Sequence, residues 1–245
     1  MPDARRTSAA DPGGMPNDSD DRVPGGERVA LRRLALTGVV GPILSVLVFT
    51  VAGALRPGYS PVHQAISALG NGAGGRLVDA VAVAMGAGLV VFAVVFATLL
   101  RPVLGRGVRR FAAVCIVLDG LGVATAGVFT DAPATTALHT AGASLGAIST
   151  LVAFAVIGVA LRRDARWRRW GGYSLAAAVV ALALVAAEYA LLMPRSPLHA
   201  LHVGGLLERA DFVWHYAWYV AFGYRLFRGP VDAAGRVEPI SSEHA

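Results

Sequence analysis

Six long apolar stretches, separated by short polar segments, run through the chain. A helix needs roughly 20 mostly apolar residues to cross the roughly 30 Å hydrocarbon core of a bilayer, and each stretch is about that long. In that core every backbone amide must find its hydrogen-bond partner inside the segment, so such stretches form helices. We therefore predict an all-α fold, a polytopic transmembrane bundle of six helices at residues 34–55, 77–100, 111–130, 139–161, 173–193 and 206–227.

The composition supports a membrane location and divides the chain into three parts. Hydrophobic residues make up 55% of the 245 residues and charged residues only 16%, whereas soluble domains contain about 25% charged residues. The mean hydropathy is +0.57. Residues 1–28 and 229–245 contain no apolar run and are predicted to be disordered cytoplasmic tails. Residues 29–228 remain as the transmembrane domain.

Arginine clusters predict the orientation. All 22 basic residues are arginine, a bias that we attribute to a GC-rich bacterial genome. The clusters precede the first helix, lie in the second and fourth loops, and follow the sixth helix; they comprise Arg28, Arg32, Arg33, Arg101, Arg106, Arg109, Arg110, Arg162, Arg163, Arg166, Arg168, Arg169, Arg225 and Arg228. Short cytoplasmic loops retain positive charge, so both termini are predicted to be cytoplasmic and loops one, three and five to lie outside. The expected location is the bacterial cytoplasmic (plasma) membrane.

This distribution of charge also narrows the partners. The net charge of +6 is confined to loops and helix ends, so it indicates membrane topology and no nucleic acid. The lipid bilayer is the expected partner. The basic, aromatic loop from Arg162 to Trp170 suits anionic lipids, which attract arginine near the membrane surface.

Small residues and the single cysteine predict features of the helix packing. Glycines in the third and fourth predicted helices, among them Gly120, Gly122, Gly142 and Gly146, predict a tightly packed hairpin, because small residues let helices approach closely in a bilayer. Cys115 is the single cysteine, so an intramolecular disulfide and a cysteine-based zinc site are excluded. We expect Cys115 to be a buried free thiol.

Titratable side chains gather on the predicted outer side. In the sixth helix Glu208, Asp211 and His215 are three and four residues apart, so they share one face, which must point into the bundle because charge in lipid is costly. Imidazoles and acids in the outer loops and helix ends extend this group. The candidate outer polar site comprises Arg56, His63, Asp131, His139, Glu188, His199, Glu208, Arg209 and Asp211.

Asp119 is a separate intramembrane acid. It follows the cytoplasmic start of the third predicted helix by eight residues, which places it roughly 12 Å deep. A structural hydrogen bond between helices and a role in a proton or ion relay are both compatible with this position.

Three functions remain open for the outer site. It could bind a polar solute or a lipid head group, or only anchor the loops at the membrane surface. It could instead line the path of a small-solute or proton-coupled transporter, with Asp119 or Glu188 as the deeper coupling site; six helices are few for a transporter, so a homo-oligomer would then be expected. Finally, His63, His139 and His199 could hold a metal ion in an intramembrane hydrolase. The chain has no HExxH motif, the sequence requires no cofactor, and we favour a protein that is not an enzyme.

Four short motifs resemble those of a known family. They are Arg56-Pro57-Gly58-Tyr59-Ser60-Pro61, Ile66-Ser67-Ala68-Leu69-Gly70, Gly127-Val128-Phe129-Thr130-Asp131 followed by His139, and Gly205-Leu206-Leu207-Glu208-Arg209. The chain from residue 34 to residue 228 resembles the bacterial and archaeal six-helix membrane proteins of domain-of-unknown-function family 998. The resemblance implies the six-helix architecture and leaves the reaction open. Ala68 stands where the family pattern leads us to expect an acid.

Overall fold

The computed structural model describes residues 25–72 and 74–229, and the described chain is all-α. Six long helices follow one another: α2 (Thr37–Leu55), α3 (Gly75–Leu99), α4 (Arg106–Val128), α5 (Thr136–Leu161), α6 (Arg168–Leu192) and α7 (Gly204–Arg228). A shorter helix, α1 (Gly25–Leu34), precedes them, and two 3₁₀ turns, η1 (Ser67–Gly70) and η2 (His199–Leu201), lie in loops. The tails predicted at residues 1–28 and 229–245 fall almost entirely outside the described residues.

The six apolar stretches all became helices, but several of the helices begin before them. Helix α4 begins at Arg106 and α6 at Arg168, each five residues before the predicted start at 111 and 173. The added first turns of these helices contain mainly arginine and glycine. They lie outside the apolar stretches from which the helices were predicted. Helix α1 contains Glu27, Arg32 and Arg33 and was not predicted for the same reason.

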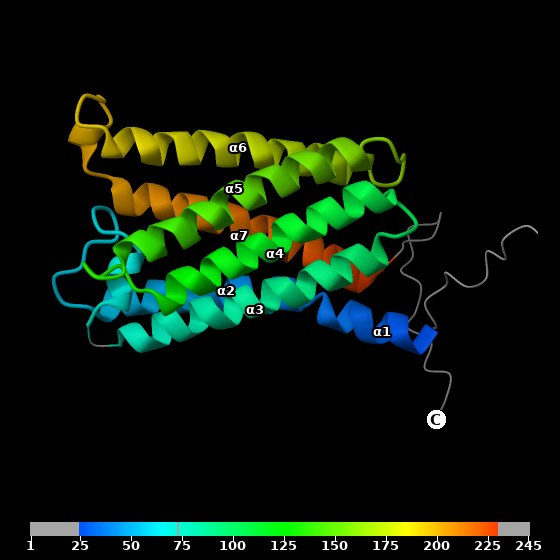
Figure 1. Cartoon of the computed structure of the whole chain (residues 1–245), viewed down its shortest axis with the longest axis horizontal. Helices are drawn as coiled ribbons and strands as arrows, with labels where there is room; N and C mark the ends of the chain where they lie inside the picture. Colours follow the sequence, from blue (N-terminus) through cyan, green and yellow to red (C-terminus); the bar gives the residue numbers. More distant parts are fainter. Residues whose placement is uncertain (1–24, 73, 230–245) are drawn as a thin grey trace, which may run out of the picture.

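The long helices form a closed ring in chain order. Each of α2 to α6 packs on its successor, and α7 packs between α6 and α2, which closes the ring. Figure 1 shows the helices lying side by side along the long axis of the molecule. Helix α1 contacts α3 and α7. An interior is therefore enclosed by six helices.

Glycines bring α3, α4 and α5 into close contact. A Cβ at Gly86 would lie 2.3 Å from the Gly120 oxygen, and a Cβ at Gly122 would lie 2.5 Å from the Gly142 oxygen. Neither distance is possible for a real side chain, so only glycine permits these crossings. The predicted tight packing of α4 on α5 is confirmed.

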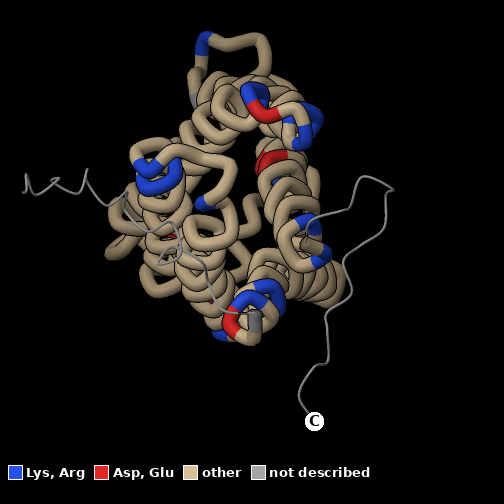
Figure 2. Tube along the Cα trace, turned by 90° about the vertical axis from the view of Figure 1, so that its right-hand side faces the viewer, with Lys and Arg blue, Asp and Glu red and all other residues tan. Residues whose placement is uncertain are grey.

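The two ends of the ring differ in chemistry. One end, the η end, carries η1, η2 and the loops at residues 56–74, 129–135 and 193–203. The other, the arginine end, carries the basic loops at residues 100–105 and 162–167 and the end of α7. Figure 2 looks along the bundle from the arginine end and shows basic segments at the loops and helix ends there.

Large aromatic side chains fill the ring toward the arginine end. Phe92, Phe154, Trp218, Tyr219 and Phe222 are fully buried. The rings of Trp218 and Phe222 stack with centroids 4.6 Å apart, and Trp218 Nε1 donates to Ser174 Oγ at 2.9 Å. The expected burial of the Cys115 thiol is confirmed as well.

Five helical segments of the described chain are long and apolar enough to cross a membrane. They are Gly26–Leu55, Gly75–Leu99, Arg106–Val128, Thr136–Leu161 and Arg168–Leu191. Helix α7 is equally long, but Glu208, Arg209, Asp211 and His215 make it less apolar, and it is not among them. Length and composition thus bear out five of the six predicted spans.

Candidate functional site

A cavity of ≈ 150 Å³ lies inside the ring toward the η end. Helices α2, α3, α4, α5 and α7 and the turn η1 form its walls. Most of the wall is apolar, with Val48, Phe49, Val81 and Phe212 among its members. The polar lining consists of Ser45, Ser67, Asp79, Asp119, Thr130, His139, Thr150, Glu208, Asp211, His215 and Tyr216.

Helix α7 supplies the largest share of the polar lining. Glu208, Asp211 and His215 line the cavity, as their spacing predicted. The exposed positions of the same stretch are Leu206, Ala210, Val213 and Ala217. The polar and apolar residues of α7 are therefore sorted to opposite faces, inward and outward.

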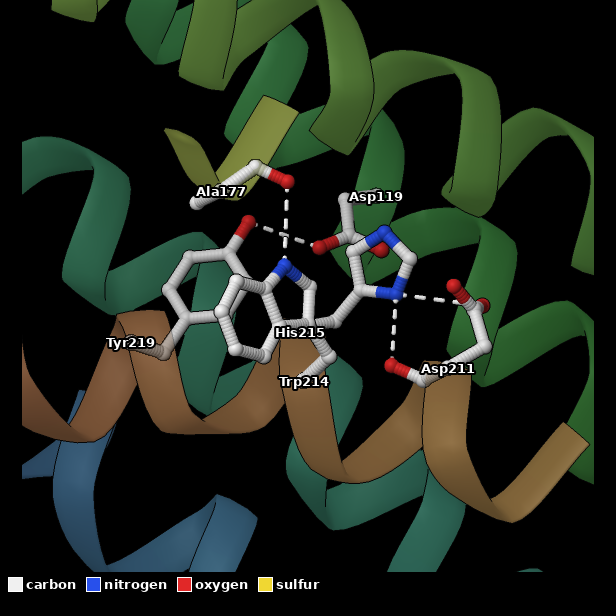
Figure 3. Close-up of polar contacts among 6 residues, drawn as sticks. All are labelled: Asp119, Ala177, Asp211, Trp214, His215 and Tyr219. Carbon is white, nitrogen blue, oxygen red and sulfur yellow. Dashed lines mark hydrogen bonds and ion pairs between the residues drawn. The ribbon is translucent and has the colours of Figure 1, made fainter. Parts of the chain in front are cut away.

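His215 and Asp211 form a pair on consecutive turns of α7. The imidazole Nδ1 lies 3.1 Å from Asp211 Oδ2 and 2.9 Å from the Asp211 carbonyl oxygen. Both neighbours are acceptors, so Nδ1 carries the proton and donates. In Figure 3 the His215 ring lies between the carboxylates of Asp211 and Asp119. One imidazole thus faces two acids that come from different helices.

Asp119 is bonded across the ring. Tyr219 of α7 donates its hydroxyl to Asp119 Oδ2 of α4 at 2.7 Å (Figure 3), and the Thr150 side chain of α5 is within hydrogen-bonding reach of both groups. A Cβ at Gly146 would lie 3.1 Å from Asp119 Oδ1, so glycine leaves room for the carboxylate. The structural hydrogen bond expected as one alternative for Asp119 is present.

Three buried polar atoms of the lining have no hydrogen-bond partner within residues 25–72 and 74–229: Ser45 Oγ, Asp211 Oδ1 and His215 Nε2. Each of these three side chains is more than nine-tenths buried. A buried polar atom left unbonded costs about 1–3 kcal/mol. Their convergence on one cavity indicates that the site is built to hold a polar group.

His139 of α5 also presents one free imidazole position to the cavity. Its Nδ1 lies 2.9 Å from the Ala126 oxygen and 3.0 Å from the Phe129 oxygen. Only a protonated Nδ1 can bond two carbonyls, so in the neutral ring Nε2 is an acceptor. The ring is close enough to Asp79 and Glu208 for their charges to interact.

Glu208 and Arg209 attach the loop at residues 56–74 to α7. The Ile66 amide donates to Glu208 Oε2 at 2.6 Å. Arg209 donates to the carbonyl oxygens of Pro61 and Gln64, each at 3.0 Å, and to the Tyr59 hydroxyl. A charge-assisted hydrogen bond is stronger than a neutral one. These two residues therefore fix η1 over the cavity.

Arg56 and Asp131 complete this attachment, and we call the four residues Arg56, Asp131, Glu208 and Arg209 the loop clamp. Arg56 Nη1 donates to the Ala68 oxygen at 2.6 Å. Asp131 accepts from Ser67 at 3.3 Å and from Thr136 at 2.9 Å. Three of the four motifs thus meet here, since the loop after α2 is tied to the turn between α4 and α5.

The other candidates lie away from the cavity lining. His63 Nδ1 is 2.7 Å from the His202 oxygen, and His199 Nδ1 is 2.6 Å from the Leu191 oxygen. Both rings hold loops together at the η end. Glu188 of α6 is close enough to Asp211 and Glu208 to interact with them electrostatically, but it is not a lining residue.

The three histidines considered for a metal do not form a ligand set. In the part of the chain that the structure describes, no group of three or more His, Cys, Asp or Glu residues is placed to hold a metal ion. Of the three, His139 alone lines the cavity.

Several lining residues were not predicted from the sequence. Ser45 and Thr150 are small polar residues within apolar stretches, and Tyr216 lies among other aromatic residues, so no pattern distinguishes them. Asp79 carried a usable signal. It is a titratable residue in an otherwise apolar segment, the placement by which Asp119 was selected.

Comparison with known proteins identifies the family of the chain. No curated protein and no solved structure matches the chain. One family model, described as protein of unknown function (DUF998), matches residues 39–225. This match includes all four motifs, five of the six long helices almost completely, and most of α7. The chain is a member of the DUF998 family of membrane proteins.

Proposed function

We propose that this protein is a six-span protein of the bacterial cytoplasmic membrane that binds a small polar solute in the cavity, from the outer side. The observation that carries the proposal is the convergence of Ser45 Oγ, Asp211 Oδ1 and His215 Nε2 on one cavity. These atoms come from two neighbouring helices of the ring, α2 and α7. A bound solute that meets them would recover the hydrogen bonds that burial removed.

The closed ring supports α7 as the sixth span. Helix α7 packs between α2 and α6, both of which belong to candidate spans, and runs beside them. Its exposed side chains along the first half are apolar. Its polar residues point into the cavity, where charged groups in membrane proteins are normally found.

Positive charge supports the orientation. The loops at the arginine end contain Arg101, Arg162, Arg163 and Arg166, while the loops at the η end contain Arg56 and Arg195. Excess arginine in short loops is typical of the cytoplasmic side. The η end and the cavity near it then belong to the outer half of the membrane, and both termini are cytoplasmic.

The arginines of the η end argue against a phosphate-bearing ligand. Arg209 donates to Pro61, Gln64 and Gly205 oxygens, and Arg56 donates to the Ala68 oxygen. Phosphate groups are normally bound by guanidinium groups or backbone amides. Because these guanidinium groups bond the loop, a solute without phosphate suits the cavity better than a phosphate head group.

Binding can be tested with a panel of small solutes. The protein, reconstituted in nanodiscs, is heated with small anions, neutral polar compounds and organic cations, and the unfolding midpoint is recorded. A solute that binds the folded state raises the midpoint. Replacing the lining residue Ala147 with leucine fills the cavity and should abolish the rise.

A matched control separates cavity filling from general damage. Ala217→Leu makes the same change at an exposed position of α7 and should keep the response. If no member of the panel raises the midpoint of the wild type, or if Ala147→Leu responds as Ala217→Leu does, solute binding in this cavity is refuted.

Transport is a second candidate, favoured by the depth of Asp119. This acid lies nine residues before the end of α4, about 14 Å from the η end. Trp218 and Phe222 fill the ring beyond it, so transport would require them to move. Uptake of the solute into proteoliposomes, if it is lost in Asp119→Asn, would establish transport. Binding of the solute without uptake would indicate a receptor.

A further inference from the structure

The titratable lining of the cavity is predominantly acidic. Four carboxyl groups line it, those of Asp79, Asp119, Glu208 and Asp211, against the imidazoles of His139 and His215. No arginine is among the described lining residues, and the chain contains no lysine. Even with both imidazoles charged, four ionised carboxylates would leave an excess of negative charge. A cationic ligand would balance it.

The unpartnered atoms specify what such a ligand must offer. Asp211 Oδ1 accepts hydrogen bonds, since Asp211 already receives the Nδ1 proton of His215 at Oδ2. In the neutral form of the His215 ring, Nε2 is an acceptor, because the proton is on Nδ1. Ser45 Oγ can accept as well. An ammonium group provides three donors and no acceptor, which matches this set.

Two of the other three acids of the cavity are already bonded, and the third, Asp79, is half-buried and close enough to His139 for their charges to interact. Glu208 accepts from the Ile66 amide, and Asp119 accepts from the Tyr219 hydroxyl. Among the lining carboxylates of the described residues, Asp211 has a buried oxygen, Oδ1, that accepts no hydrogen bond. A cation would bind at this oxygen, close to His215.

An aromatic wall stands beside Asp211. Phe49, Phe212 and Tyr216 line the cavity, with Phe49 and Phe212 edge to face at 6.3 Å and Phe212 and Tyr216 at 5.4 Å between centroids. The face of an aromatic ring attracts a cation and also packs against hydrocarbon. Carboxylate and aromatic rings together suit an amine that carries a short hydrocarbon part.

The size of the cavity limits that hydrocarbon part. A cavity of ≈ 150 Å³ is comparable to engineered cavities of about 150 Å³ that admit benzene. A compact amine with about as many heavy atoms as benzene would fill it.

We propose that the cavity selects compact primary amines in their protonated form, with Asp211 Oδ1 as the principal acceptor and Phe49, Phe212 and Tyr216 around the hydrocarbon part. This inference rests on the proposed function and names its class of ligand. The amine belongs to a free solute. An ethanolamine head group carries the same ammonium group but adds a phosphate, for which the described lining offers no arginine.

Three probes that share a cyclopentyl ring test the charge preference. Protein in phosphatidylcholine nanodiscs is titrated with cyclopentylamine, cyclopentanol and cyclopentanecarboxylate, and binding is followed by the unfolding midpoint and by calorimetry. Cyclopentylamine should bind about tenfold or more tightly than cyclopentanol, because it adds a charge-assisted hydrogen bond. The carboxylate should not bind.

Asp211→Asn tests the assigned acceptor. The variant keeps the shape of the side chain and removes its charge, so the affinity for cyclopentylamine should fall about tenfold or more while that for cyclopentanol stays nearly constant. Asp164→Asn is the matched control in the loop after α5, where the carboxylate accepts the Arg166 amide at 2.8 Å. It should bind the amine as the wild type does.

Nanodiscs that contain phosphatidylethanolamine separate the two sources. Competition between that lipid and cyclopentylamine would identify the head group, and unchanged amine binding would identify a free solute. Equal affinity for amine and alcohol, or an Asp211→Asn variant with full amine affinity, would overturn the amine inference. Binding of an anion from the panel of small solutes, if it is abolished by Ala147→Leu, would also overturn the amine inference. It would leave the proposed function in place.

Discussion

His215 lies on the inner face of α7, between the carboxylates of Asp211 and Asp119. Its Nδ1 bonds the carboxylate and carbonyl of Asp211, while its Nε2 is unpartnered and the ring lies toward Asp119 (Figure 3). Fixing one nitrogen on a known acceptor sets the proton on that nitrogen and leaves the other available. His215 therefore lies between Asp119 of α4, whose carboxylate accepts the Tyr219 hydroxyl, and the part of the cavity where a ligand would bind.

The hydroxyl of Tyr219 should matter through Asp119. Tyr219→Phe keeps the ring in the aromatic core and removes the donor to the carboxylate. A buried acceptor that loses its partner costs about 1–3 kcal/mol, so the free energy of unfolding in mixed micelles should fall by that amount.

Tyr224→Phe gives the matched comparison. Tyr224 is exposed and accepts a hydrogen bond from Arg228 at 3.0 Å, so its loss should change stability little. Equal effects of the two substitutions would contradict the assigned role of Tyr219.

Ser45 should behave as a residue kept for binding. Because Ser45 Oγ has no partner in the described chain, Ser45→Ala should leave the solute-free protein unchanged or stabilise it by up to about 1 kcal/mol. Ser174→Ala removes an oxygen that accepts from Trp218 at 2.9 Å and should destabilise by about 1–3 kcal/mol. Thermal unfolding of both variants checks the contrast, and a comparable loss in Ser45→Ala would mean that its hydroxyl is structural.

Helix α7 and the loop at residues 56–74 behave as one unit at the scale of elements. Glu208 and Arg209 of the loop clamp bond the backbone of the loop just before η1, at Ile66 and Pro61, and the Leu206 amide donates to the Val62 oxygen at 3.0 Å. A Cβ at Gly205 would lie 2.2 Å from the Gln64 oxygen, so the close approach of the loop requires glycine. The motifs shared with the family therefore build the support of the cavity at the η end.

Arg209→Lys should loosen this loop although it retains the charge. A lysine ammonium cannot reproduce the planar fork that reaches Pro61, Gln64 and Tyr59 together. Hydrogen exchange of the amides at residues 59–66 should become about tenfold or more faster. Arg195→Lys, at an exposed position in the loop after α6, should change nothing, and unchanged exchange in Arg209→Lys would show that the arginine does not hold the loop.

The crossing of α4 and α5 should not tolerate a methyl group at Gly122. A Cβ there would meet the Gly142 oxygen at 2.5 Å and the Gly146 nitrogen at 2.6 Å, so the helices would have to separate. Gly122→Ala should cost about 1–3 kcal/mol of unfolding free energy, as overpacking usually does. Gly107→Ala in the same helix meets nothing within 4 Å and should be neutral. Near-equal unfolding midpoints would contradict the close approach.

The elements were predictable to different degrees. Apolar length located all six long helices, and the spacing of Glu208, Asp211 and His215 identified the inner face of α7, because charge in an apolar segment must turn inward. The type of a residue did not reveal which group it would hydrogen-bond in the folded protein. Arg56 and Arg209 were expected in the ligand site, but they bond loop carbonyls, and Ser45 joined the lining through packing between helices distant in sequence.

At the scale of the whole molecule, a ring of six helices holds a polar cavity toward one end and an aromatic core toward the other. This arrangement predicts access to the cavity from the η end, since Trp218 and Phe222 fill the interior toward the arginine end. Together with the proposed orientation, it predicts a cavity that opens to the outer aqueous phase.

Chemical labelling of a single introduced thiol tests this claim most directly. Ser45 lies ten residues before the end of α2, about 15 Å from the η end, where lipid would exclude a charged reagent. Ser45→Cys in a Cys115→Ser background is treated, in spheroplasts, with a membrane-impermeant, positively charged methanethiosulfonate. Leu47→Cys, exposed at nearly the same depth, and the buried Cys115 of the wild type are the controls.

A cavity open to the outer side predicts that the thiol at position 45 reacts with reagent added outside, while the two controls do not. Failure of that thiol to react from outside, or reaction only when inverted vesicles present the cytoplasmic face, would contradict the account.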